Sequence, residues 1–443
     1  MKIPKLDEML YDVQIGDVSG QDSLMSVETG SVKDDILSIL LFLLIIISTG
    51  MAGYFGPPVR KSGLLDFKYH QSIYLTPKNR FLRLSILFNL EKPTQNTSLP
   101  VNFDYTIKTI KKGQTLAEIK KKIQNNCFIV PGQTQTLPME FFYDRFVKYD
   151  EADIQIGFDK NGEFVGGNIL WESLDEYHAF FNIWVRAIFI VSSIIVCTLF
   201  VTRLFNYKNG YNKEQVITAF MAQVAIYGTN PLYPLLVFFP YSLFSYFEDI
   251  AFAVSTTSVL LVATLIIVLN SIAKKNKKLN TVFIVVGIYA FLLIFSMLHE
   301  FSKENIFSPS LAYVFNIIYG ILFVFYSLIT ISLSILTLVR TDSSERHKFT
   351  VYTIVFVATF IFLGFSQLFE AKTNNSSGSS LKIATIHCFA ILLVYFHWPY
   401  ETSIDQQYNE GFDDQNVDDF EPSVDEEQIN NLQIKIESDP EEA

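Results

Sequence analysis

Long blocks of apolar residues dominate this sequence, and they decide what the chain can fold into. A helix needs about 20 predominantly apolar residues to cross a bilayer. Eight blocks approach or exceed that length, at residues 36–56, 179–202, 215–244, 250–273, 281–299, 310–339, 349–369 and 383–398. Because backbone groups in hydrocarbon must satisfy one another within a segment, each block is expected to be a membrane-spanning helix.

The charged residues are few, and their imbalance lies at the two ends of the chain. Only 18% of the 443 residues are charged, compared with about 25% in soluble domains. Of the net charge of -11, residues 399–443 contribute -14 and residues 1–34 contribute -4, so the remainder carries +7. This composition excludes a simple cytosolic enzyme, a disordered protein and a nucleic-acid-binding domain. We therefore expect two acidic tails on a membrane body whose partners include lipid and no nucleic acid.

The short loops between the blocks predict the orientation of the helices, because Lys and Arg mark the cytoplasmic face. Ten basic residues follow the second, fourth and sixth blocks, against three in the loops on the other side. Both termini are therefore expected in the cytoplasm. Residues 57–178 then form a luminal or extracellular domain, and residues 179–398 form a bundle of seven helices.

The first block, assigned to residues 35–56, is expected to be an uncleaved signal anchor. A cleaved signal peptide is the alternative, but such a peptide begins with a short basic region. Here 34 residues with an acidic excess precede the block.

Sequons for N-glycosylation agree with this orientation, because their acceptors must face the secretory lumen. Asn96 lies in the long domain, and Asn374 and Asn375 lie between the seventh and eighth blocks. All three are candidate glycosylation sites. No sequon falls in a loop assigned to the cytoplasm.

Residues 57–178 show mostly the period-two pattern of β-strands. Residues 101–108 and 153–158 alternate apolar and polar side chains, which places one face inward and one toward water. Another strand is expected through residues 81–88. The pattern predicts a β-sandwich, which either only folds or presents a binding surface outside the cytoplasm.

Two local signals refine this domain. Asp159-Lys160-Asn161-Gly162 predicts a hairpin connection, since Asn-Gly supplies the positive φ angles of a tight turn. Thr115 and Glu118 form a capping-box pattern ahead of Ile119 and Ile123, which predicts one helix among the strands.

The predicted bundle contains few residues of the kinds that catalysis or ion transport requires. Ionisable residues deep in a span usually mark ion paths or proton relays, and His387 is the one expected well inside, whereas Arg186, Glu300 and Glu370 lie near outer ends. No HExxH, GxSxG or paired-Asp motif occurs in the spans, and the three cysteines are far apart. We expect no catalytic residue, no metal site and no cofactor.

The third block is the irregular one. Pro231, Pro234 and Pro240 follow Gln223 and Asn230 within it, and proline removes a donor from the helical ladder and kinks or breaks the helix. Irregular backbone survives at membrane depth only against protein or a water-filled cavity. The kinked helix therefore either packs against its neighbours or opens a cleft toward lipid.

The order of these parts resembles the Wntless / transmembrane protein 181 family. The most specific stretch runs from Glu214 to Ile250. Its Asn-Pro-Leu-Tyr-Pro-Leu sequence at 230–235 is similar to the family's Asp/Asn-Pro-aromatic-aromatic-Pro-Leu segment. Glu248-Asp249 stands where the family carries an acidic pair before the next span. The Cys-rich pattern of the animal Wnt carrier's luminal domain is missing from this chain.

The resemblance implies a cargo receptor of the Golgi, endosome and plasma membrane. The luminal β-sandwich, similar to the Golgi-dynamics type, would dock a secreted or lipidated protein, and the bundle would shelter an acyl chain or lipid. Burying a fatty chain contributes about 0.8 kcal/mol per methylene. The candidate cleft residues are Gln223, Tyr227, Asn230, Pro231, Tyr233, Pro234, Glu248 and Asp249.

The tail at 399–443 is too charged to fold alone and is expected to be disordered. Ser423 and Ser438 precede acidic residues and are candidate phosphorylation sites, through which the tail would meet cytosolic sorting machinery. The alternative function is a seven-helix signalling receptor, similar to G-protein-coupled receptors, with the β-sandwich as sensor. A structural membrane protein without a ligand is the third interpretation.

Overall fold

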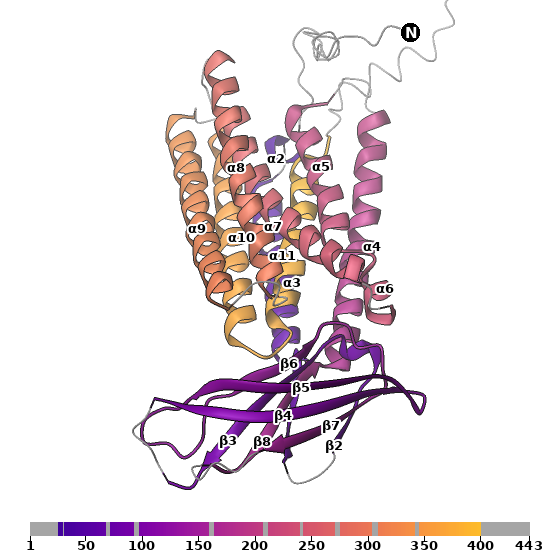
Figure 1. The fold of residues 1–443 in the computed structure, drawn as a ribbon. Coiled ribbons are helices and arrows are strands. Elements are labelled where there is room, and N and C mark those ends of the chain that lie inside the picture. Colours follow the sequence, from indigo (N-terminus) through magenta and orange to yellow (C-terminus); the bar gives the residue numbers. More distant parts are fainter. Residues whose placement is uncertain are drawn as a thin grey trace, which may run out of the picture. The chain divides into compact units, whose positions relative to one another are not determined.

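The computed structural model describes residues 25–29, 31–67, 71–92, 97–158, 164–206, 211–239, 242–270, 275–303, 309–341 and 345–399. The chain divides into two compact units, residues 1–399 and residues 400–443. All described residues belong to the first unit, which contains an N-terminal helix, a β domain and a helical cluster (Figure 1). The predictions for Asn96, Ser423 and Ser438 lie outside the described residues.

The β domain is a sandwich of two antiparallel four-stranded sheets in the described part of the chain. One sheet has the order β1-β8-β3-β6 and the other β2-β7-β4-β5. The strands are β1 (Arg60–Asp66), β2 (Gln71–Tyr74), β3 (Leu82–Leu90), β4 (Ser98–Lys111), β5 (Gln114–Phe128), β6 (Met139–Asp144), β7 (Glu151–Phe158) and β8 (Phe164–Leu174). The predicted sandwich and its three predicted strands, now β3, β4 and β7, are confirmed.

The core of the sandwich explains why these segments form strands. Phe103, Tyr105 and Ile107 of β4 are buried, while the residues between them are more exposed. Their side chains pack with Phe88 and Ile154 from the other strands into one apolar cluster. Burying one face of each sheet in this way stabilises the domain, because each buried large side chain contributes about 1.5–3 kcal/mol.

The predicted helix ahead of Ile119 and Ile123 is wrong, because these residues belong to β5. Strand β5 pairs with β4 in antiparallel register along nearly its whole length. A tight turn joins the two strands, with positive φ at Lys112 (50°) and Gly113 (77°). A spacing of four residues places side chains on one face of a strand as well as of a helix, so the two isoleucines fit both structures.

The predicted hairpin at residues 159–162 is also wrong. These residues themselves are outside the described part, but the strands on either side are β7 and β8, which belong to different sheets. Strands β7 and β8 therefore lie in different layers of the sandwich and do not pair with each other. An Asn-Gly pair supplies a turn, but it does not decide which strands become neighbours.

The N-terminal helix α3 (Val32–Tyr54) and the cluster after the sandwich contain the membrane-spanning segments. The remaining helices are α2 (Ser26–Thr29), α4 (Glu176–Asn206), α5 (Lys213–Gly228), α6 (Tyr233–Phe238), α7 (Ser242–Asn270), α8 (Lys275–Lys303), α9 (Pro309–Arg340), α10 (Arg346–Lys372) and α11 (Ser377–Phe396). Seven helices of the described residues are long and apolar enough to span a membrane, namely α3, α4 and α7 to α11.

The predicted third span is divided, as its prolines indicated. It consists of α5, with 16 residues, and the short α6, with 6 residues, separated by Thr229–Leu232. Helix α11 lies at the centre of the cluster and is buried along nearly its full length, in contact with α3, α4, α5 and α10. The approach to α3 is close, since a Cβ atom at Gly53 would lie 2.1 Å from the Ser380 hydroxyl oxygen.

Candidate functional site

The break between α5 and α6 is built around Asn230. This residue is 1% exposed and has a φ of 55°, in the left-handed region that Asn tolerates better than most residues. Its Oδ1 atom accepts a hydrogen bond from the Leu232 amide (3.1 Å), and its carbonyl accepts one from the Tyr233 amide (3.1 Å). Pro231 and Pro234 bring no backbone donors. The sequence Asn-Pro-Leu-Tyr-Pro therefore ends one helix and starts the next within a few residues.

Arg186 of α4 packs against this break. Its Nη1 atom donates to the Thr229 carbonyl at 2.9 Å, and its Nη2 atom donates to Glu248 Oε1 at 2.8 Å. The guanidinium carbon lies 3.8 Å from the ring centroid of Tyr233 and 4.9 Å from that of Phe252. The cation thus satisfies a carbonyl that the broken helix leaves open and gains cation–π contacts with two rings.

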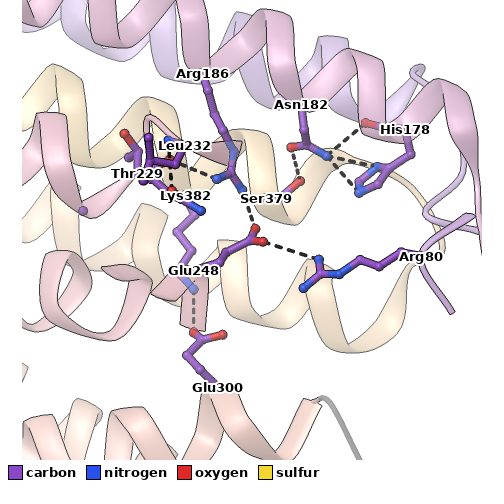
Figure 2. Close-up of polar contacts among 12 residues, drawn as sticks. Arg80, His178, Asn182, Arg186, Thr229, Leu232, Glu248, Glu300, Ser379 and Lys382 are labelled. Atoms are coloured by element: carbon purple, nitrogen blue, oxygen red, sulfur yellow. Dashed lines mark hydrogen bonds and ion pairs between the residues drawn. The ribbon is translucent and has the colours of Figure 1, made fainter. Parts of the chain in front are cut away.

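Glu248 connects the bundle to the sandwich. Its Oε2 atom lies 3.4 Å from Nη1 of Arg80, which follows the short helix η1 (Pro77–Asn79) in the β domain. The neighbouring Asp249 lies 3.8 Å from Arg145, also in the β domain. One carboxylate, that of Glu248, therefore contacts a cation of the sandwich and the cation that packs on the broken span (Figure 2).

A second buried ion pair lies near the first. Lys382 Nζ of α11 donates to Glu300 Oε1 of α8 at 2.7 Å. The side chains of Lys382 and Glu300 are only 3% and 8% exposed. The same Lys382 Nζ lies 4.8 Å from the ring centroid of Phe252, so the cations of the two pairs share one aromatic ring. Figure 2 shows both pairs, with Arg186 bound to Thr229 at the break.

Neutral polar contacts link the central helix to the break and to α4. His387 of α11 lies 2.6 Å from the Ser193 hydroxyl of α4 and 2.9 Å from the Thr229 hydroxyl. Nearer the sandwich, the Asn182 amide group contacts His178 and accepts a hydrogen bond from Ser379 (3.2 Å). His387, predicted as the ionisable residue deepest in the bundle, is thus a packing link between three segments.

The structure brings together only part of the predicted cleft. Asn230, Tyr233, Glu248 and Asp249 are buried at the break. Gln223 and Tyr227 lie on the exposed face of α5, and Tyr227 is 64% exposed. Pro231 is exposed and Pro234 is half-buried, so both act through the backbone they shape.

Sequence reasoning missed Arg80 and Arg145, and it misplaced Lys382. Lys382 was expected in the loop before the eighth span, but it lies inside α11 and is 2% exposed. The Ser-Gly-Ser-Ser run at 377–380 looks like a loop, although it is helical and buried. Small residues here allow α11 to approach its neighbours, as at Gly378, where a Cβ atom would lie 2.4 Å from Glu370 Cγ.

An apolar hollow lies between α8 and α9, apart from the break. Its volume is about 460 Å³, and it is lined by Ile284, Gly287, Ile288, Phe291, Leu292, Leu322, Phe325 and Tyr326. Ile284, Phe291 and Phe325 are exposed at its rim, whereas Leu292 and Tyr326 are buried at its floor. This volume is within the range of about 300–1,000 Å³ that small-molecule sites occupy.

The two described sequons are held by hydrogen bonds. Asn374 accepts from the Arg60 amide (2.8 Å) and donates to the Arg60 carbonyl (2.9 Å), as a strand neighbour would. Asn375 Oδ1 accepts from the Thr373 hydroxyl at 2.9 Å and from the Ser377 amide at 3.2 Å. These contacts fix the loop before α11 to the first residues of the β domain. Glycosylation at either position stays a prediction.

Comparison with known families gives a match to the helical part of the chain. A family model described as "Wntless-like, transmembrane domain" matches residues 175–401. The match begins at the residue before α4 and extends beyond the end of α11, so it includes the break, both buried ion pairs and the hollow. A search among curated proteins found no match.

Proposed function

Because the chain belongs to the Wntless-like family, whose model covers more than half of its residues, we propose that it is a cargo receptor of the secretory pathway. Its cargo would be secreted proteins that carry a fatty acyl chain. The receptor would hold the protein part at the β-sandwich and the acyl chain in the helical bundle.

The observation that carries this proposal is the hollow between α8 and α9. Figure 1 shows the two helices side by side, and every residue that lines the hollow except Gly287 and Tyr326 has a hydrocarbon side chain. A fatty chain in this place is removed from water, which contributes about 0.8 kcal/mol per buried methylene. The exposed rim residues Ile284, Phe291 and Phe325 would leave an entrance from the lipid side.

The break between α5 and α6 has a different part in this proposal. Arg186 packs against the break. The predicted cleft residues at the break therefore contact Arg186, one another and the sandwich, and they do not line the hollow. We propose that Glu248 couples the position of the sandwich to the bundle, because it contacts Arg80 and Arg186 at once. Cargo docked on the sandwich would then act on the helices through this carboxylate.

The topology follows from the loop charges. With both termini in the cytoplasm, the sandwich lies in the lumen of the Golgi or endosome or outside the cell. The acidic residues 399–443 would meet cytosolic sorting machinery, and phosphorylation of Ser423 or Ser438 would add charge to that contact.

Secretion of acylated proteins tests the function directly. Cells that naturally express this chain are fed an alkynyl fatty acid, and the labelled proteins in the medium are compared before and after its gene is deleted. We expect acylated secreted proteins to fall in the medium and to accumulate in the cell, while secreted proteins without an acyl chain are unaffected. Unchanged export of all acylated proteins would refute the proposal.

A further inference from the structure

The end of the bundle away from the sandwich is closed by the chain's own N-terminal segment. Helices α3, α5 and α10 begin at this end and α11 ends there, because the chain leaves the sandwich at the start of α4. The segment Met25–Thr29 contains the short helix α2 and lies against α10 and α11. Its Met25 and Val27 side chains are each 1% exposed and belong to the apolar core of the bundle.

Backbone and charge contacts hold the segment in a defined register. The Ser26 amide donates to the Trp398 carbonyl at 3.0 Å, and Met25 pairs with Pro399 as an isolated antiparallel bridge. Lys348 Nζ of α10 donates to Glu28 Oε1 at 2.8 Å. We call the surface formed by Lys348, Trp398 and Pro399 the α2 seat. It binds a strand-like backbone and one carboxylate, while the apolar core of the bundle takes the two apolar side chains of the segment.

The charged and polar groups of the α2 seat also have partners other than α2. Lys348 Nζ has a second carboxylate partner, Glu214 of α5, at 3.2 Å, so the buried cation keeps a counter-charge when Glu28 leaves. His397, which precedes Trp398 of the seat, is hydrogen-bonded to the Tyr352 hydroxyl (2.6 Å) and to the Thr218 hydroxyl. None of these contacts involves α2.

The contacts at the start of α3 do not involve the segment Met25–Thr29 either. Helix α3 is capped by its own Ser31, whose hydroxyl accepts from the Lys33 amide at 3.2 Å. A further contact, between His347 of α10 and Asp35 of α3 (2.8 Å), fixes the start of α3 to the bundle. Release of Met25–Thr29 therefore removes neither the cap nor the anchor of α3.

From these contacts we propose that the α2 seat is a peptide-binding surface, which the chain occupies with its own segment until a partner peptide of the same chemistry displaces it. That chemistry is an apolar residue, any residue, a second apolar residue and an acid, as in Met25-Ser26-Val27-Glu28. The apolar pair fills the core positions, and the acid binds Lys348. On the orientation proposed above this end faces the cytoplasm, so the partner is a cytosolic protein.

Binding in trans to the full chain tests the proposal. The probe is a fluorescent peptide with the sequence of residues 24–31, and the receptor is the full chain in detergent carrying Met25→Ser and Val27→Ser. A tethered ligand acts at an effective concentration of about millimolar. We therefore expect saturable binding to this variant and binding at least about tenfold weaker to the wild-type chain, where the tethered segment competes. No saturable binding to the variant, or equal binding to both chains, would overturn the proposal.

The acid position has its own control. A probe peptide with Glu28→Gln loses a charge-assisted hydrogen bond, and we expect about tenfold weaker binding to the same variant. A probe with the same residues in scrambled order should not bind. Equal binding of all three peptides would show nonspecific adsorption and would overturn the proposal.

A second measurement does not depend on the folding of the double variant. Cys127, Cys197 and Cys388 are buried, so the wild-type chain offers a low background for thiol labelling. A Val27→Cys chain should react slowly with a maleimide and faster when excess probe peptide displaces the segment. A rate that the peptide leaves unchanged would overturn displacement. The assays use neither cargo nor fatty acid, so their outcome is independent of the cargo-receptor function.

Discussion

The Nη2 atom of Arg186 lies 2.8 Å from the Oε1 atom of Glu248, and both side chains are buried, with 5% and 10% of their surface exposed. The pair joins α4 to α7 across the break in the third span, since Arg186 also donates to the Thr229 carbonyl. A buried charge is tolerated only when it is paired and hydrogen-bonded. The broken helix is therefore stabilised by an ion pair whose carboxylate also contacts Arg80 of the sandwich.

Replacing Glu248 with Gln should destabilise the protein strongly. The substitution removes the negative charge that lies 2.8 Å from the buried Arg186 guanidinium. Removing one partner of a buried ion pair costs about 3–5 kcal/mol. We expect a clearly lower melting temperature for the purified chain in detergent. The matched control is Glu172→Gln, which removes a carboxylate 3.4 Å from Arg83 in a more exposed pair and should cost about 0–1 kcal/mol. Equal losses for the two variants would contradict the role assigned to Glu248.

The pair of Lys382 and Glu300 should behave as a coupled unit. Because both side chains are buried and 2.7 Å apart, either single substitution, Lys382→Met or Glu300→Gln, removes the counter-charge of this pair from the charge that stays. The double substitution removes both charges, so we expect it to be less destabilising than the sum of the single ones. Melting temperatures of the four chains complete the double-mutant cycle. Additive losses would show that the two residues act independently.

Asn230 should tolerate Gly better than Ala. Its φ of 55° lies in the left-handed region, where a residue with a Cβ atom is disfavoured by about 1–2 kcal/mol and Gly is not. Both substitutions remove the hydrogen bond from the Leu232 amide to Asn230 Oδ1, so their difference isolates the backbone conformation. We expect the Asn230→Ala chain to melt at a lower temperature than the Asn230→Gly chain. The reverse order would contradict this conformation at the break.

Glycosylation should occur at Asn96 in preference to Asn374 and Asn375. The amide of Asn374 donates to the Arg60 carbonyl at 2.9 Å, and Asn375 Oδ1 accepts from the Ser377 amide at 3.2 Å. We expect glycosidase treatment to shift the electrophoretic mobility of the wild-type chain and of Asn374→Gln, but not of Asn96→Gln. A wild-type chain that glycosidase leaves unchanged would contradict the luminal position of the sandwich.

The local features of the fold were predictable, because they depend on nearby residues. Apolar length located the spans, and Asn230-Pro231 together with Pro234 predicted the break. Period-two alternation predicted β4 and β7. The predicted helix before Ile123 failed because its apolar spacing suits a strand equally well, and pairing with β4 decided between them.

The ion pairs of the site were not predictable, because their partners are distant in sequence. Glu248 is 62 residues from Arg186 and 168 from Arg80, and nothing in the neighbourhood of Arg80 indicates contact with the bundle. Lys382 was placed in a loop because polar small residues precede it, although they are the residues that let α11 pack closely. Long-range pairing of this kind depends on the assembled fold.

The central claim is that the hollow between α8 and α9 holds an acyl chain, and two glycines offer a matched test of it. A Cβ atom at Gly287 or at Gly320 would meet nothing within 4 Å, so a side chain can leave the backbone at both positions without a clash at its first atom. Only Gly287 lines the hollow, and its replacement by Leu would fill part of that space.

The decisive measurement is labelling of the full chain by a photoactivatable fatty acid in intact cells, followed by mapping of the labelled peptides. We predict that the wild-type chain and Gly320→Leu are labelled in α8 and α9, and that Gly287→Leu loses most of this labelling while it expresses normally. Equal labelling of the two Leu variants, or label spread over all lipid-facing helices, would contradict the account.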